Sequence, residues 1–184
     1  RTAAERTSER RYEFLTEDVL DSSHEATVVI DADGSVVWAN EATATLLGVD
    51  RNDLRGREYA SAATDHFQDI EAGAESLTSL IQTGLASHGD QLDATVHVPG
   101  KEARTERWLE YRSAPIEAGV HAGGRIENYH DITSRYRREQ YLQTLHRATR
   151  ELMTAETDED VTTHAVATAT GALDLPYAAV FTRD

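Results

Sequence analysis

Eight histidines are the residues best suited to hold a metal ion in this chain of 184 residues, which contains no cysteine. No two of these histidines are four residues apart, the spacing that places a pair of zinc ligands on one face of a helix. Without cysteine, zinc–thiolate sites, iron–sulfur clusters, disulfides and thiol nucleophiles are excluded. The sequence therefore predicts no metal site.

The segment Asp31–Gly34 (DADG) superficially resembles the start of a calcium-binding loop. An EF-hand needs a third ligand before the glycine and a glutamate six residues after it, and both are missing. Asp33 and Gly34 instead have the residue types of a tight hairpin turn, which requires positive φ angles. The chain also shows no nucleotide-binding loop, no nucleophile–base pair and no assignable pair of catalytic carboxylates. We expect no catalytic site in this segment.

Acidic residues dominate the composition, with 33 Asp and Glu against 18 Lys and Arg and a formal net charge of −15. This charge argues against direct contact of the segment with nucleic acid or an anionic membrane, because both need a basic surface. The chain has one lysine, Lys101. Acidic, lysine-poor composition resembles that of proteins from salt-loving archaea, where dissolved ions screen the repulsion between charges.

The sequence predicts neither a membrane-spanning segment nor a secretion signal. No apolar run approaches the roughly 20 residues of a membrane span, and no signal peptide opens the sequence. We therefore expect a cytoplasmic protein. Because the sequence begins at Arg1 rather than Met, we also expect it to be part of a longer protein.

The first part of the chain predicts helices around one hairpin. Residues 1–22 carry an amphipathic helix, and two β-branched runs flank Asp33-Gly34 in residues 26–40. A helix over residues 41–47 is followed by Gly48, a favourable residue after a helix end. Asp50 is suited to cap a further short helical turn.

The second part predicts three strands and then helices. A helix over residues 69–87 precedes strands near residues 91–98, 108–116 and 124–132. With the hairpin they give an α+β fold: a five-stranded antiparallel sheet with helices on one face. A helix follows over residues 133–155, with the seam Leu142, Leu145, Thr149 and Leu152 suited to pairing with another helix.

Three motifs in residues 11–133 resemble a PAS domain: VVIDADGSVVWANEAT (28–43), LLGVDRNDLRGR (46–57) and RIENYHDIT (125–133). The resemblance implies an N-terminal helix at 1–22, a sensory PAS domain at 23–133 and a signalling connector helix at 134–156. The tail from Tyr141 is similar to the entry of a GAF domain, which implies an incomplete α/β GAF start at 157–184.

The resemblance implies an intracellular signalling role. The phrase LHRATRELMTAET is similar to PAS–GAF regulators of halophilic archaea, including bacterio-opsin-activator-like proteins. These continue into a DNA-binding domain, which favours transcription regulation, and related sensors end in a histidine kinase. Ser23-His24-Glu25 does not match a phospho-accepting helix, because a strand follows. A ligand-free interaction or dimerisation module, acting as a homodimer, is the third hypothesis.

PAS relatives commonly hold a small organic ligand between the sheet and the helices. On this resemblance, alternate strand positions predict pocket residues in two sets: Val36, Trp38 and Asn40, and Ile126, Asn128 and His130. Alternatively, Asn40 caps the helix that begins at Glu41, and His130 meets solvent or the connector.

The sequence does not identify a cofactor. A flavin adduct needs a cysteine, which the chain lacks, whereas flavin bound without a covalent bond stays open. Haem is disfavoured, because His66 and His88 flank the helix that supplies the axial histidine in haem-binding relatives.

The end of the last strand is the expected point of signal transmission. Thr133 is suited to cap the connector helix, and Asp131 is placed to pair with Arg135 or Arg137. A change in the sheet would then tilt or rotate the connector. Ordinary capping without a switching role is the alternative.

Overall fold

The computed structural model describes residues 23–87, 89–101, 104–155, 157–171 and 179. The chain divides into two compact units, Arg1–Thr133 and Ser134–Asp184. The helix predicted for residues 1–22 lies outside the described residues, as does the strand predicted for 177–182 apart from residue 179.

The predicted hairpin opens the described part of the first unit. Strand β1 (Ala26–Ile30) pairs antiparallel with β2 (Val36–Ala39). Gly34 has φ of 86° in the turn, and its backbone N–H donates to the Asp31 carbonyl over 2.9 Å. A residue with a Cβ would be strained at this φ, so the Asp33-Gly34 signal is confirmed.

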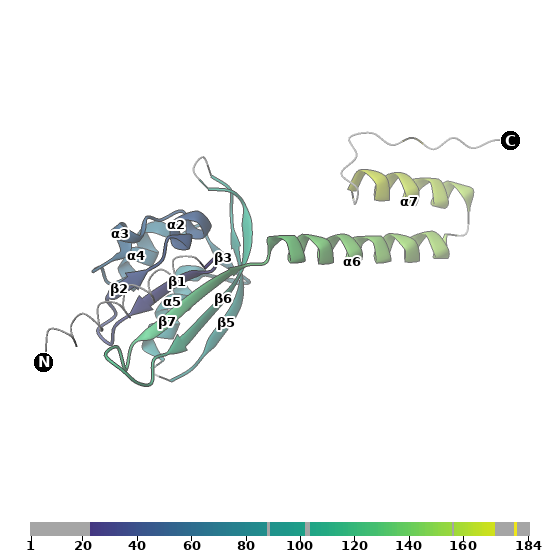
Figure 1. The fold of residues 1–184 in the computed structure, drawn as a ribbon. Helices are drawn as coiled ribbons and strands as arrows, with labels where there is room; N and C mark the ends of the chain where they lie inside the picture. Colours follow the sequence, from purple (N-terminus) through teal and green to yellow (C-terminus); the bar gives the residue numbers. More distant parts are fainter. Residues whose placement is uncertain (1–22, 88, 102–103, 156, 172–178, 180–184) are drawn as a thin grey trace, which may run out of the picture. The chain divides into compact units, whose positions relative to one another are not determined.

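Four described helices lie in the chain between the first hairpin and the three long strands. Helix α2 (Ala42–Leu47) ends at Gly48, and the Asp50 side chain caps α3 (Arg51–Leu54), as the sequence predicts. Helices α4 (Tyr59–His66) and α5 (Leu77–Ala86) come next. These helices lie beside the sheet in Figure 1.

The sheet has seven strands, which corrects the predicted five. Strands β3 (Glu71–Ala72) and β4 (Glu75–Ser76) form a small hairpin at Gly73 (φ 65°), within the segment predicted as the start of a helix. Helix α5 therefore begins only at Leu77, where the Ser76 hydroxyl accepts a bond from the Ser79 N–H. Two-residue strands carry no periodic pattern that a sequence could display.

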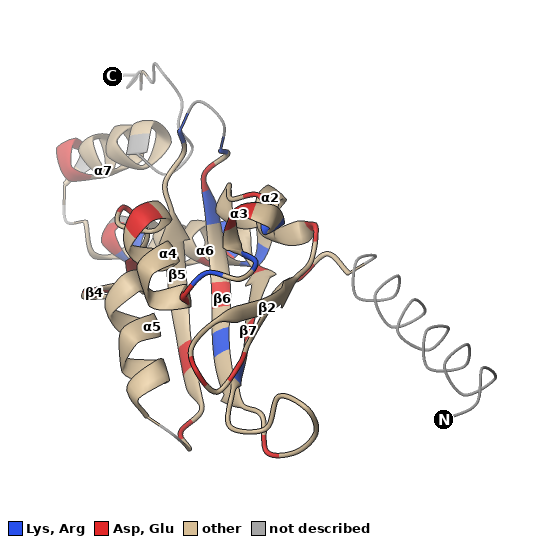
Figure 2. Cartoon of the chain, turned by 90° about the vertical axis from the view of Figure 1, so that its left-hand side faces the viewer, with Lys and Arg blue, Asp and Glu red and all other residues tan. Residues whose placement is uncertain are grey.

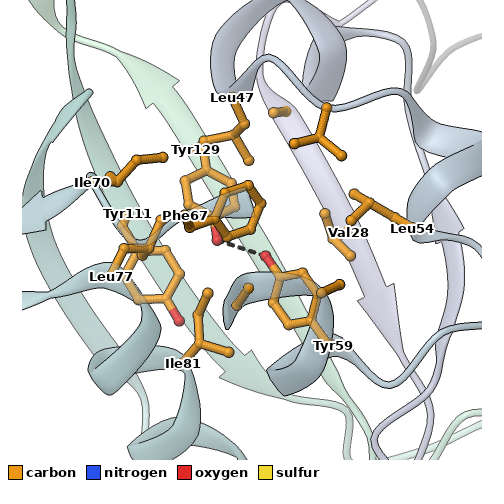
Figure 3. Close-up of a cluster of buried hydrophobic side chains, with 14 of the residues drawn as sticks. Val28, Leu47, Leu54, Tyr59, Phe67, Ile70, Leu77, Ile81, Tyr111 and Tyr129 are labelled. Atoms are coloured by element: carbon orange, nitrogen blue, oxygen red, sulfur yellow. Dashed lines mark hydrogen bonds between the residues drawn. The ribbon is translucent and has the colours of Figure 1, made fainter. Parts of the chain in front are cut away.

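The long strands β5 (Leu92–Val98), β6 (Arg107–Pro115) and β7 (Arg125–Asp131) complete the sheet. Its order is β2-β1-β7-β6-β5-β3-β4, with antiparallel pairing throughout. The last strand in sequence therefore lies in the interior of the sheet, between β1 and β6. The core occupies the face toward the helices, where Figure 3 shows side chains from α4 and α5 meeting those of β6 and β7.

The second unit contains α6 and α7. Helix α6 runs over Thr133–Thr154 and α7 over Asp158–Gly171. The Thr157 hydroxyl accepts from the Asp160 N–H, and the Asp160 carboxylate accepts from the Thr157 N–H, a reciprocal cap that the T-x-x-D pattern predicts. Among the described residues, no helix is both long and apolar enough to cross a membrane.

Candidate functional site

Three tyrosines from α4, β6 and β7 meet between the helices and the sheet (Figure 3). Tyr59, Tyr111 and Tyr129 are fully buried. The hydroxyl oxygens of Tyr59 and Tyr129 are 2.7 Å apart, and the ring centres of Tyr111 and Tyr129 are separated by 5.2 Å. Burial is the main cause that raises the pKa of all three hydroxyls, so they are protonated at neutral pH.

A buried carboxyl lies beside this cluster on β7. Glu127 is 1% exposed, and its Oε1 accepts a hydrogen bond of 2.7 Å from the Ser113 hydroxyl on β6. Within the described part of the chain, Glu127 Oε2 and Tyr111 Oη have no hydrogen-bond partner. Burial raises the pKa of Glu127, and the Ser113 and Tyr111 hydroxyls and Arg125 offset this only in part.

Arg125 connects this carboxyl to the end of α5. Its Nε donates to the Ser113 hydroxyl over 2.8 Å, and its two terminal nitrogens donate to the carbonyls of Ser87 and Asp90 over 3.0 and 2.7 Å. Gly84 lies beside this group: a Cβ there would be in ordinary contact with Ser113 Oγ at 3.5 Å and Arg125 Nε at 3.6 Å, and in tight contact with Leu92 Cδ1 at 3.2 Å.

A cleft of about 630 Å³ opens where the hairpin turn, α5 and the β6–β7 loop come together. Arg125 and Ser87 line it together with the carboxylates of Asp31, Asp33 and Glu58. The charged side chains of the lining are therefore mainly acidic. The guanidinium of Arg125 is bonded to the protein's own carbonyls.

The pocket residues predicted on β7 share one face, but that face is turned away from the helices. Arg125, Glu127 and Tyr129 alternate with them and occupy the buried side. Asn128 accepts a hydrogen bond from the Thr27 hydroxyl, and His130 Nδ1 lies 2.9 Å from Glu25 Oε1. The charges of β6 in this region are mixed in sign (Figure 2). Ile126, Asn128 and His130 thus surround no interior space, and a role in ligand binding stays a prediction.

The predicted pocket residues near β2 are divided between two faces. A register shift between Val29 and Ile30 pairs Trp38 with Val29, while Val36 pairs with Ile30 on the buried side. This irregularity corrects the expectation that Val36 and Trp38 share a face, because one extra residue reverses the alternation of side chains.

Asn40 joins the start of the hairpin to α2. Its Oδ1 accepts from the Thr27 N–H and the Thr43 hydroxyl, and its Nδ2 donates to the Glu25 carbonyl. The helix cap position is Glu41. Asn40 is fully buried, and these three hydrogen bonds join it to other parts of the protein.

The predicted transmission residues meet where β7 leads into α6. Asp131 Oδ2 lies 2.6 Å from Arg107 on β6, and Asp131 Oδ1 accepts from the Thr133 N–H over 2.9 Å. The Thr133 hydroxyl accepts from the Trp108 N–H over 3.0 Å. The structure thus joins Asp131 and Thr133 to β6, whereas Arg135 belongs to the other unit.

The described residues contain no group of three or more His, Cys, Asp or Glu side chains arranged to hold a metal ion. The carboxylates nearest one another around the cleft accept local hydrogen bonds, such as those from Ala32 N–H to Asp31 and from the Ser61 hydroxyl to Glu58.

Sequence reasoning missed Glu127, Tyr111 and Arg125 as interior residues. In the segment RIENYHD, Ile126 is the aliphatic residue. It suggests that the face that carries Ile126, Asn128 and His130 is turned toward the core. Tyr129 lies on the opposite face of the strand, and its aromatic side chain is the sequence feature that favours burial of that face. Burial of Arg125 and Glu127 is tolerable because both have hydrogen-bond partners. These partners are distant in sequence, so strand periodicity cannot predict them: Ser87, Asp90 and Ser113.

Comparison with known proteins identifies the fold of the first unit. A family model described as PAS fold matches residues 20–137. No curated protein matches the chain. The chain is similar to the PAS domain of nitrogen regulation protein NR(II) from Vibrio parahaemolyticus, with 18% identity, a TM-score of 0.44, and coverage of 64% of this chain and 98% of that one.

Two further solved structures are similar. The PAS domain of an HTR-like protein from Haloarcula marismortui shares 18% identity, with a TM-score of 0.45 and coverage of 70% of this chain and 99% of that chain. An RNA-binding Light-Oxygen-Voltage receptor shares 19% identity, with a TM-score of 0.53 and coverage of 78% and 39%. Because the family model covers more than half of the sequence, the chain belongs to the PAS family.

Proposed function

We propose that residues 23–133 are a sensory PAS domain that passes a change in its sheet to α6. The observation that carries this proposal is the double attachment of the α6 start: Asp131 and Thr133 are both bonded to neighbouring residues of β6. A displacement of β6 against β7 would alter these bonds together, and thereby the direction or order of the first turn of α6.

The proposed signal is a small organic ligand or a protein partner. The tyrosines packed between helices and sheet support a partner at the outer face, because a ligand among them would have to displace buried side chains. Ile126, Asn128 and His130 are then proposed contacts for that partner, with a second copy of the chain as the first candidate. If the signal is a ligand instead, its proposed contacts are Val36 and Asn40 on the buried side and Trp38 on the opposite face of the hairpin.

The proposed output is transcription regulation by a DNA-binding domain in the longer protein, with a histidine kinase as the alternative. Residues 157–184 are proposed as the start of a GAF domain, for which the cap at Thr157 and helix α7 provide a suitable beginning. We place this regulator in the cytoplasm of a halophilic archaeon, on the acidic composition of the chain.

Amide hydrogen exchange tests the coupling between sheet and helix. Asp131→Asn removes the charge that pairs with Arg107, and faster exchange is expected in residues 134–140. Asp93→Asn is a matched control, because Asp93 also pairs with an arginine, Arg112, over 2.8 Å, but away from the junction. Equal exchange of residues 134–140 in both variants and the unaltered chain would contradict the proposal.

Native mass spectrometry of the purified chain distinguishes the two kinds of signal. A co-purified small molecule whose removal changes exchange in α6 would support a ligand. A mass that fits the chain alone, together with a concentration-dependent second copy, would support a partner.

A further inference from the structure

Burial favours the neutral form of the Glu127 carboxyl, whereas the hydroxyls around it and Arg125 favour the charged form. The titratable groups facing it are Tyr111 from β6, Tyr129 and Arg125 from β7, and Tyr59 from α4. Strand β1 places Val28 opposite Glu127 in the ladder. From α5, Gly84 packs against Ser113 and Arg125. Arg125 is the one positive charge in this set.

Arg125 lies within ion-pair distance of the carboxyl but makes no direct hydrogen bond to it. Its Nε is 3.8 Å from Glu127 Oε1, beyond hydrogen-bond distance, and the Ser113 hydroxyl stands between them, accepting from Arg125 and donating to Glu127. The terminal nitrogens of Arg125 bind the carbonyls of Ser87 and Asp90, at the end of α5 and the start of the following loop. A guanidinium in this position has two competing acceptors: the helix-end carbonyls and the carboxyl.

The proton on Glu127 decides this competition. We propose that Glu127 is a proton-controlled latch: while its carboxyl is neutral, Arg125 holds the end of α5, and loss of the proton draws the guanidinium to the carboxylate and releases that end. The proton passes to bulk water, and the Tyr111 hydroxyl turns to donate to Glu127 Oε2. The two unpartnered buried atoms of the neutral state become a hydrogen-bonded pair.

The burial of Glu127 agrees with this direction. Removal from water penalises the charged form, so the pKa of Glu127 lies above its ordinary value. Ionisation consequently occurs at a higher pH than for an exposed glutamate. The cleft responds as well, because Arg125 and Ser87 both line it. The latch does not depend on the proposed sensory role, because the release of the end of α5 and the change at the cleft can both be measured on the isolated chain.

A titration followed by NMR tests the latch on the whole chain. The side-chain carboxyl carbon of Glu127 is followed against pH, with the exposed Glu75 as an internal reference, and the backbone amides of Ser87 and Gly89 are followed in the same samples. We expect Glu127 to titrate at higher pH than Glu75, and the two amide signals to shift with the midpoint of Glu127.

The control variants are Glu127→Gln and Glu75→Gln. In Glu127→Gln, the component of the Ser87 and Gly89 amide shifts at the midpoint of Glu127 is expected to be lost. Glu75→Gln keeps that component. Titration of Glu127 together with Glu75 would overturn the proposal, and so would amide signals of Ser87 and Gly89 that ignore its midpoint. Both results come from the unaltered chain, so they stand even if Glu127→Gln fails to fold.

Discussion

The hydroxyl oxygens of Tyr59 and Tyr129 lie 2.7 Å apart and join α4 to β7, an interior strand of the sheet. Both side chains are fully buried, so each hydroxyl depends on the other in place of water. This bond ties the helical layer to the strand that leads into α6. Helix α4 and the junction at Asp131 are thereby connected through three residues of one strand, from Tyr129 to Asp131.

Tyr59→Phe is expected to destabilise the fold by about 1–3 kcal/mol, because it leaves the Tyr129 hydroxyl buried without a partner. Urea unfolding measures the change in the free energy of unfolding. The double variant Tyr59→Phe/Tyr129→Phe is the control, since removal of both hydroxyls leaves no orphaned group. Its loss should be smaller than the sum of the two single losses. Strict additivity would show that the two hydroxyls are not coupled.

Gly124→Ala is expected to disrupt the start of β7. An added Cβ would lie 2.0 Å from the Ile30 carbonyl oxygen, a backbone atom that cannot move aside without shifting β1. We expect a loss of about 3 kcal/mol or more in the free energy of unfolding. Gly89→Ala is the matched control, because a Cβ at Gly89 meets nothing within 4 Å. Similar unfolding midpoints for the two variants would contradict this packing account.

Local chemistry explains why much of the fold could be predicted. The Asp33-Gly34 turn, Gly48 after α2, the Asp50 cap and the Thr157 cap each depend on residues a few positions apart. The hairpin of β3 and β4 could not be predicted in this way. It consists of two-residue strands, and β3 is fixed by a partner in β5, His97, that is 26 residues from Glu71.

Asn40→Ala is expected to weaken the connection between the hairpin and α2. It removes the acceptor of the Thr27 N–H and the donor to the Glu25 carbonyl. At about 1–3 kcal/mol for each of these two groups left without a partner, we expect a loss of about 2–6 kcal/mol. Asn52→Ala is a surface control, expected within about 0.5 kcal/mol of the unaltered chain. An Asn40→Ala chain as stable as Asn52→Ala would refute the structural role of Asn40.

The stability of the chain should carry an acid-sensitive contribution from Asp131. Partial burial acts to raise the pKa of Asp131, but hydrogen bonds from Thr133 and the charge of Arg107 hold it below the ordinary value. A folded-state pKa below the unfolded one gives stability that is present above the unfolded pKa and is lost as pH falls through the folded pKa. Asp131→Asn removes this contribution.

Urea unfolding of the unaltered chain and Asp131→Asn over a pH series measures it. The difference in free energy of unfolding should be largest near neutral pH and should shrink toward acid. A difference that stays constant across the series would show that the charge of Asp131 is not what stabilises the junction.

The candidate site was less predictable than the fold. The sequence predicts Asp131 and Thr133 as transmission residues, and this role stays a prediction. The structure shows that Asp131 pairs with Arg107 on β6, a contact that the sequence did not indicate. Neighbours in sequence suggested Arg135 and Arg137, whereas strand pairing brings Arg107 close from 24 residues away. Glu127 was missed because a buried carboxylic acid contradicts the ordinary preference of charged residues for the surface.

The most direct test of the central claim measures the distance between the sheet and α6. The chain has no cysteine, so Glu75→Cys and Glu139→Cys provide two unique sites for spin labels, and pulsed electron paramagnetic resonance gives the distribution of distances between them. The account predicts that Asp131→Asn shifts or broadens this distribution, while Asp93→Asn leaves it unchanged. The same distribution in Asp131→Asn as in the unaltered chain would contradict transmission through the junction.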